Sequence, residues 1–354
     1  MYQPCRRHPI SDMMHIMNLR TALISAVIPA LCLPLLLAAA EPEQKITNGP
    51  IQAKIYLPSS KDGFYKGQRF DWSGVIASLT YKGHNYYGPW FTERRAGVRD
   101  FVYEGDKIVT GTASSITGPV DEYAPLDYAE APAGGAFVKL GVGLLRKPDT
   151  TAYDHYKDYA FVDEGKWTVT HGPSWVTFRH ELTAPNGIAY VYTKTVRLVE
   201  GQPRMVLEHT LRNTGKVAIK TTGYNHNFLT LDGKPAGPGY TVSTAFDLKT
   251  ARPLEGGLAG ISGKQVAYQK TLQGEDKVST PLQGFGATAA DYDFRLENKA
   301  AGAGIHLTGD RPLARAMMWS IRTVVAVEPF IDINVEPGKD MTWNYTYEFY
   351  TLDK

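Results

Sequence analysis

Two short segments of the chain contain a histidine and a glutamate that could transfer protons. His226 lies in residues 224–228 between tyrosine and phenylalanine, and Glu328 lies in residues 327–330, before a proline and a phenylalanine. Both segments have strand-like surroundings. One group that donates a proton and one that accepts it are the minimum for moving a proton on a sugar or a carbonyl compound. The pair is therefore predicted to act as acid and base in one site.

Each residue also has a structural interpretation. A single histidine among aromatic side chains is, on its own, more often a hydrogen-bonded structural residue. Glu328 follows the apolar residues 324–327, which predict a buried strand. A carboxylate in that position must be paired or functional, because burying it without a partner costs several kcal/mol. A buried ion pair with Arg322 or Arg315 is the structural alternative.

Other kinds of chemistry find little support in the sequence. Gly141-Val142-Gly143 lacks the third glycine and the following helix of a dinucleotide-binding loop, so it is interpreted as a pair of strand glycines. Ser73 and Ser174 are not flanked by the glycines of a hydrolase nucleophile elbow. The histidines after residue 40 form no pairs at metal-binding spacing. We expect no cofactor and no bound metal, with carboxylate-bound calcium as the alternative to test.

Residues 1–40 have the organisation of a secretory signal. Arg20 precedes an apolar run, and three alanines ending at Ala40 form a small-residue cleavage site. Met17 is the better start, because the residues before it add nothing that a signal needs. Both cysteines, Cys5 and Cys32, lie in this segment. The sequence thus predicts an exported, thiol-free protein in the periplasm or outside the cell, without disulfides or thiolate-bound zinc.

The charge of the remaining chain limits its partners. Residues 1–40 contain three of the 38 basic residues and one of the 36 acidic ones, so residues 41–354 are formally neutral. Nucleic acids and anionic membranes are bound by clustered lysine and arginine, and the sequence has no such cluster. We expect a small-molecule sugar or an oligosaccharide as ligand, no nucleic acid, no membrane contact after signal cleavage, and a monomer or weak dimer.

Alternating apolar and polar residues dominate the chain, whereas helical periodicity never persists beyond about two turns. The alternation in residues 205–211, the turn at 213–215 and the apolar residues 217–219 predict a hairpin. Further strands are predicted at residues 75–81, 137–145, 167–170, 175–182, 189–199, 304–308 and 341–351. Residues 256–263 and 273–284 are predicted to be long loops. These patterns predict a single all-β domain over residues 41–354, with two packed antiparallel sheets.

Several segments have counterparts in one known family. Asn225-His226-Asn227-Phe228-Leu229 is similar to the Asn-His-x-Tyr-Phe-x-Leu stretch of aldose 1-epimerases, the galactose mutarotase family. Downstream, Tyr292-Asp293-Phe294 resembles its Tyr-Asp-His segment, and Val327-Glu328-Pro329-Phe330 resembles its Leu-Glu-Pro-Gln. The order matches, and the resemblance covers most of residues 70–350. It implies a β-supersandwich in which His226 protonates the ring oxygen of a pyranose while Glu328 takes the proton of the anomeric hydroxyl.

Five residues are predicted to bind the sugar. Asn225 and Asp293 lie in the segments that resemble the family, whereas Lys139, Arg146 and His155 lie in the segment between residues 121 and 156 that departs from its pattern. The sequence departs from the family pattern where the Leu-His-Gly-Gly stretch, which supplies a second active-site histidine, has no counterpart. Phe330 also replaces the glutamine of the family. The chain is therefore interpreted as a divergent member.

Two other functions fit the same pattern. The pocket could bind carbohydrate without chemistry, or the protein could cleave polysaccharides, because the same fold class includes lyases and parts of glycoside hydrolases. An open cleft lined by Trp72, Trp90, Tyr86 and Tyr87 would favour a polymer. A closed pocket around His226 and Glu328 would favour exchange of anomers.

Overall fold

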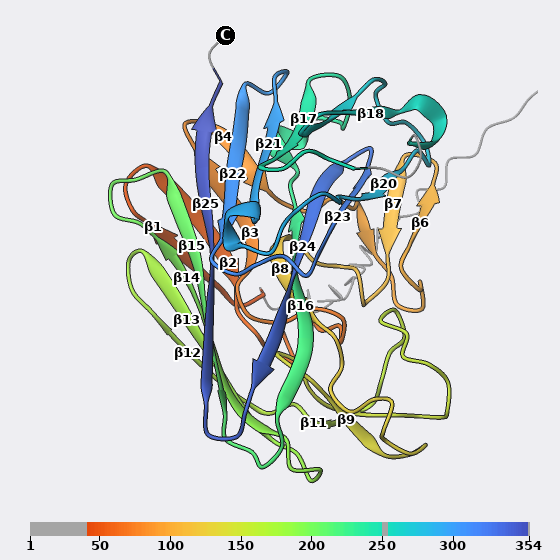
Figure 1. The fold of residues 1–354 in the computed structure, drawn as a ribbon, viewed down its shortest axis with the longest axis vertical. Coiled ribbons are helices and arrows are strands. Elements are labelled where there is room, and N and C mark those ends of the chain that lie inside the picture. The colour runs from red at the N-terminus through yellow and green to blue at the C-terminus, as the bar shows by residue number, and fades with distance from the viewer. Residues whose placement is uncertain (1–40, 250–253, 353–354) are drawn as a thin grey trace, which may run out of the picture. The chain divides into compact units, whose positions relative to one another are not determined.

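The computed structural model describes residues 41–249 and 254–352, so the predicted signal peptide lies outside the described residues. The described residues belong to one compact unit, and its elements are shown in Figure 1. Within this part of the chain, no helix is both long and apolar enough to cross a membrane.

Two antiparallel sheets contain most of the described strands. In spatial order, the larger sheet contains ten strands: β12 (Lys166–His171), β13 (Trp175–Thr183), β14 (Ala189–Leu198), β15 (Arg204–Asn213), β25 (Asp340–Thr351), β22 (Ala303–Gly309), β21 (Asp293–Asn298), β17 (Tyr240–Thr244), β19 (Gln265–Tyr268) and β18 (Ala259–Ser262). The second sheet contains five: β20 (Val278–Pro281), β23 (Arg315–Ile321), β24 (Val324–Val335), β16 (Ile219–Phe228) and β8 (Gly118–Tyr123).

Smaller elements complete the unit. The four-stranded sheet consists of β1 (Glu43–Thr47), β2 (Ile51–Tyr56), β3 (Val75–Tyr81) and β4 (His84–Tyr87). The two three-stranded sheets, in spatial order, consist of β11 (Phe161–Asp163), β10 (Gly143–Arg146) and β9 (Ala136–Lys139), and of β5 (Glu93–Arg94), β7 (Lys107–Thr110) and β6 (Phe101–Glu104). Three single-turn 3-10 helices are described: η1 (Leu231–Gly233), η2 (Glu255–Gly257) and η3 (Ala289–Asp291).

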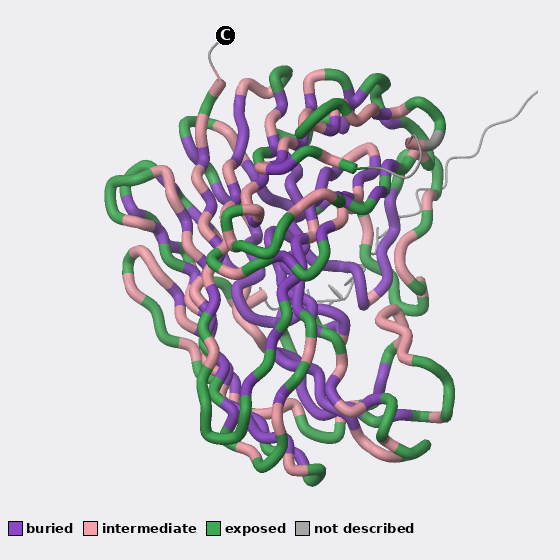
Figure 2. The backbone as a smooth tube through the Cα atoms, viewed as in Figure 1, coloured by how far each residue is buried: buried purple, intermediate pink, exposed green. Residues whose placement is uncertain are grey.

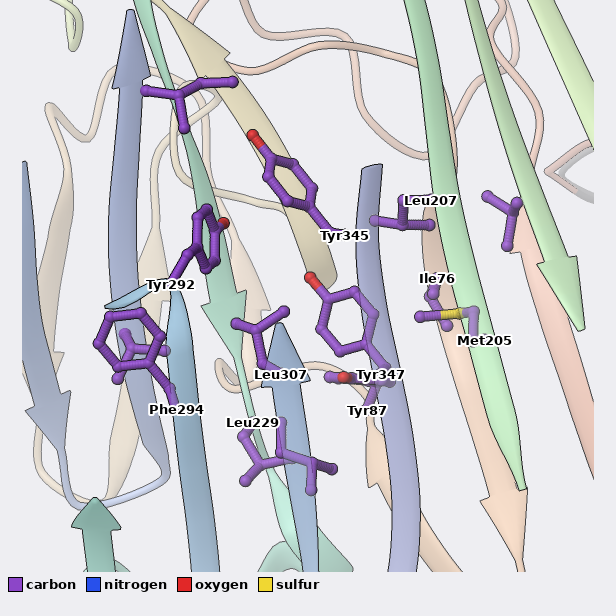
Figure 3. Close-up of a cluster of buried hydrophobic side chains, with 14 of the residues drawn as sticks. Ile76, Tyr87, Met205, Leu207, Leu229, Tyr292, Phe294, Leu307, Tyr345 and Tyr347 are labelled. Atoms are coloured by element: carbon purple, nitrogen blue, oxygen red, sulfur yellow. The ribbon is translucent and has the colours of Figure 1, made fainter. Parts of the chain in front are cut away.

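The main core lies between the ten-stranded and the five-stranded sheet. Alternate residues of β24, such as Val325 and Val327, join the same buried cluster as Leu207 of β15 and Tyr347 of β25. Figure 3 shows the aromatic and aliphatic side chains from several strands that meet in this cluster. Buried residues follow the strands, and exposed residues concentrate in the connections (Figure 2). The prediction of two large packed antiparallel sheets is confirmed.

Polar groups also bridge the two sheets. The Tyr347 hydroxyl lies 2.6 Å from Asn225 Oδ1 and 2.7 Å from Asn227 Oδ1. Asn225 Nδ2 donates to Asp121 Oδ1 at 3.0 Å, and Lys194 forms a fully buried ion pair with Asp121. Because buried polar groups are costly without partners, this network favours one relative placement of the sheets.

Three details of the sequence-based topology are wrong. The segments predicted to form a hairpin are β15 and the start of β16, and they lie in different sheets. Both edges of β15 are already paired, with β14 and β25, so the chain crosses to the second sheet. The strand predicted at 137–145 is instead the hairpin of β9 and β10, and the Val142 amide donates to the Lys139 carbonyl across its turn. The loops predicted at 256–263 and 273–284 contain β18 and β20.

Candidate functional site

The outward face of the five-stranded sheet forms the floor of a cavity of about 420 Å³. Successive side chains of a strand point to opposite faces. On β16, the even-numbered Thr222, Tyr224, His226 and Phe228 line this cavity. The odd-numbered Asn225 faces the core between the sheets, as its contact with the ten-stranded sheet shows. Strand alternation thus explains why His226 reaches the cavity.

Strand pairing brings Glu328 next to His226. Strands β16 and β24 are antiparallel, with Tyr224 opposite Phe330. Continuing this register by two residues places His226 opposite Glu328, as expected for cross-strand neighbours. The Nε2 atom of His226 lies 3.4 Å from Oε1 of Glu328. The two residues that the sequence predicts to be acid and base therefore share one pocket.

Burial controls the protonation of this pair. The His226 ring stacks on Phe228 with 3.7 Å between ring centroids, and its Nδ1 atom has no hydrogen-bond partner among the described residues. Burial, with a smaller contribution from Arg69, lowers the pKa of His226 well below its usual value. Burial raises the pKa of Glu328 to about 7, although Arg69 and Arg315 act in the opposite direction. Contact between the two groups favours an ion pair, but burial disfavours both charges. A single proton on the pair therefore resides on Glu328 rather than on His226, and Glu328 loses it as the pH rises through about 7.

A second ionic group occupies one side of the cavity. Arg69 Nε donates to Glu122 Oε2 at 2.7 Å, and the Tyr224 hydroxyl donates to the same oxygen at 2.5 Å. His155 Nδ1 lies 3.1 Å from Glu122 Oε1. Burial alone would raise the pKa of Glu122, but Arg69 and His155 outweigh it and hold the pKa far below its usual range. Glu122 is therefore a permanent carboxylate that orients Arg69, Tyr224 and His155.

Aromatic rings form much of the remaining cavity lining. They are Trp90, Phe101, Tyr153, Tyr156, Trp319 and Phe330. The Arg315 guanidinium lies 3.7 Å above the centre of the Phe330 ring, within range of a cation–π interaction. Flat apolar walls with a few convergent polar groups are typical of small-molecule sites. The stacked arginine adds a positive charge to this lining.

The structure places only one of the five predicted binding residues in this lining. His155 lines the cavity, whereas Asn225, Lys139, Arg146 and Asp293 do not. Lys139 is buried, and its ammonium donates to the Tyr123 carbonyl. Arg146 is exposed and donates to the Gly134 carbonyl at 2.7 Å. Asp293 lies in the other sheet, where its Oδ1 is 2.9 Å from Nε2 of His306.

The structural alternatives from the sequence can also be placed. Glu328 contacts His226 and forms no ion pair with Arg315 or Arg322 among the described residues. Of the four aromatic residues proposed for an open cleft, Trp90 lines the cavity. The other three, Trp72, Tyr86 and Tyr87, are buried in the core. The described residues contain no cluster of three or more potential metal ligands.

Sequence reasoning missed Arg69 and Glu122, which come from distant parts of the chain. Glu122 belongs to β8, whose six residues are all buried. An acidic pair, Asp121 and Glu122, inside such a strand was a usable signal, because buried carboxylates require partners. Arg69 gave no comparable signal, since it lies in a connection before β3 that only tertiary structure places.

Comparison with known proteins shows which solved structures share this fold. No family model matches the sequence, and no curated protein matches it. A galactose mutarotase related enzyme from Lactobacillus acidophilus superposes with a TM-score of 0.50 at 10% identity, covering 88% of this chain and 99% of that one. The fold is that of a galactose mutarotase-like β-supersandwich.

Other solved structures of this class give similar values. An aldose epimerase homologue from C. elegans has a TM-score of 0.47 at 12% identity, covering 89% of this chain and 100% of its own. A galactose mutarotase-like protein from Lactobacillus casei has a TM-score of 0.46 at 15% identity, covering 87% and 100%. At these identities the similarity concerns the fold alone, and the chemistry depends on the residues of the cavity itself.

Proposed function

We propose that the protein interconverts the anomers of a sugar by acid–base catalysis in the cavity of the five-stranded sheet. The observation that carries the proposal is the contact of His226 with Glu328, 3.4 Å apart on a floor surrounded by aromatic side chains. Both groups can give and take protons, and both lie within reach of one bound ring. The predicted signal peptide supports action outside the cytoplasm.

The reaction requires one proton on the pair. One group protonates the ring oxygen while the other takes the proton of the anomeric hydroxyl, which opens the ring to the aldehyde. After rotation about the bond between the first two carbons, the same transfers run backwards and close the ring as the other anomer. The pair ends as it began, so neither an oxidant nor a second substrate is needed. Each group is expected to contribute about 10²–10⁴-fold.

The electrostatics favour particular roles in the ring-opening step. Burial places the single proton on Glu328 and leaves His226 neutral near neutral pH. We therefore propose that Glu328 donates to the ring oxygen and that His226 accepts from the anomeric hydroxyl. The resemblance to the family implies the opposite assignment. Both assignments contain the same number of protons, so they differ in tautomer and share one dependence on pH.

The rest of the lining supports binding of a polyhydroxylated ring. Arg69, Tyr224 and His155 are held in place by Glu122, which limits the rotamer entropy lost when they bind hydroxyl groups. The aromatic walls can pack against the apolar faces of a pyranose. We propose His155 as a binding residue, together with Arg69.

The test is a time course of freshly dissolved pure anomers, followed by proton NMR across a panel of aldoses. At least one aldose should equilibrate faster with the protein than in buffer. His226→Gln and Glu328→Gln should each slow this exchange by about 10²–10⁴-fold. Binding without faster exchange would instead support the non-catalytic function.

A further inference from the structure

A second cavity, of about 730 Å³, lies next to the first. The two share Pro125 and Tyr153 in their linings. Tyr153 therefore stands at the junction, where its ring stacks on Tyr159 with 5.6 Å between centroids. The proposed chemistry does not use this second cavity.

One strand face connects the two cavities. Lys220 of β16 lines the second cavity, while Thr222 and His226 line the first. These even-numbered residues share a face, because side chains of a strand alternate. With a rise of about 3.3 Å per residue, Lys220 and His226 are roughly 20 Å apart along the strand. This continuous face is longer than a single pyranose ring.

The second cavity offers hydrogen-bonding groups. Thr150, Thr151 and Glu130 line it and are exposed, as is Lys220. Asp127 also lines it and accepts a hydrogen bond from Asn186 at 2.8 Å. Hydroxyls, carboxylates and an ammonium lie in one concave surface together with the Tyr128 and Tyr153 rings. Polar groups that can hydrogen-bond, next to aromatic faces, suit a ligand rich in hydroxyl groups.

We infer that the second cavity binds the sugar units attached to the one that reacts, so that the substrate is an oligosaccharide with a free reducing end. This inference rests on the proposed function. Ring opening requires a hemiacetal, which an oligosaccharide has only at its reducing end. The sugar unit at the reducing end occupies the cavity with His226 and Glu328. The other sugar units are attached through one of its remaining hydroxyl groups and extend past Tyr153 along the face of β16.

The experiment compares β-linked gluco-, galacto-, manno- and xylo-oligosaccharides of one to four units. Anomer exchange is measured by NMR and affinity by calorimetry. The kcat/KM for exchange should rise at least about tenfold from one unit to three in one series. Ala152→Trp, at an exposed position that lines the second cavity, should remove this gain and leave the monosaccharide value unchanged. Lys220→Ala should reduce the gain.

A matched control is Lys216→Ala, an exposed lysine outside both linings, which should keep the full dependence on length. Equal kcat/KM for all lengths, with monosaccharide exchange present, would overturn the inference and leave the proposed function standing. Suppose that affinity rises with oligosaccharide length, that Ala152→Trp abolishes this rise, and that no sugar exchanges its anomers faster than in buffer. This result would support sugar binding in the second cavity and refute the proposed chemistry. Failure of every sugar to bind would overturn both.

Discussion

Replacing Glu328 by glutamine should stabilise the folded protein at alkaline pH. Burial raises the pKa of this carboxyl from 4.5 to about 7, and its side chain is 15% exposed, so water screens it little. Between these pH values the folded state holds a proton that the unfolded state has lost, and stability therefore falls as pH rises. At about 1.4 kcal/mol per pKa unit, the full cost above pH 7 is about 3 kcal/mol.

The assay is urea unfolding of the wild type and Glu328→Gln at several pH values from 4 to 8.5. The difference in unfolding free energy should shift in favour of the variant by about 3 kcal/mol across this range. Glu336→Gln, which changes an exposed residue just after β24, is the control and should show almost no such shift. A constant difference between wild type and Glu328→Gln, or a shift against the variant at high pH, would refute the burial argument.

Four further outcomes are expected. Anomer exchange should be bell-shaped in pH, because the pair needs one proton; activity should fall above an apparent pKa near 7 for Glu328 and at acidic pH as His226 becomes protonated. Glu122→Gln should lower the unfolding free energy by about 3–5 kcal/mol, since it leaves the Arg69 charge buried without its partner. Tyr347→Phe should cost about 1–3 kcal/mol but leave the KM for sugar unchanged. Dialysis against a chelator should leave activity intact.

These outcomes have their own controls and counter-results. Glu208→Gln breaks the surface pair with Arg197 and should cost less than about 1 kcal/mol. A similarly small loss for Glu122→Gln would show that the buried pair is not needed. An increase in KM for Tyr347→Phe would show that Asn225, the contact of Tyr347, takes part in sugar binding after all. Activity that rises steadily through pH 8 would contradict the requirement for one proton on the pair. Activity lost to a chelator and restored by calcium would show a metal requirement.

The sequence could predict many of the strands and the two residues, His226 and Glu328, that meet in the cavity, because alternation and a buried carboxylate are local signals. It predicted the strand at residues 75–81 with the same bounds as β3. It did not predict strand partners, since pairing of β16 with β24 depends on which edges other strands have already occupied. The hairpin prediction was wrong for that reason.

The predicted binding residues also divide into those that local pattern can judge and those that only the tertiary structure places. The motif that contains His226 predicts a binding role for its neighbour Asn225, yet adjacent residues of a strand point to opposite faces, and Asn225 contacts Tyr347 in the core. Alternation alone could have excluded it. His155 reaches the cavity on a connection after β10, and Arg69 on one before β3, so their positions depend on the tertiary structure.

The most direct test of the central claim is the rate of anomer exchange for the best aldose, measured by NMR for the wild type, His226→Gln, Glu328→Gln and the double variant. We expect losses of about 10²–10⁴-fold in each single variant, with measurable sugar binding. The double variant should be little slower than either single one, because both residues act on the same proton transfers. Wild-type exchange no faster than buffer for every aldose, or full activity in either single variant, would contradict the claim.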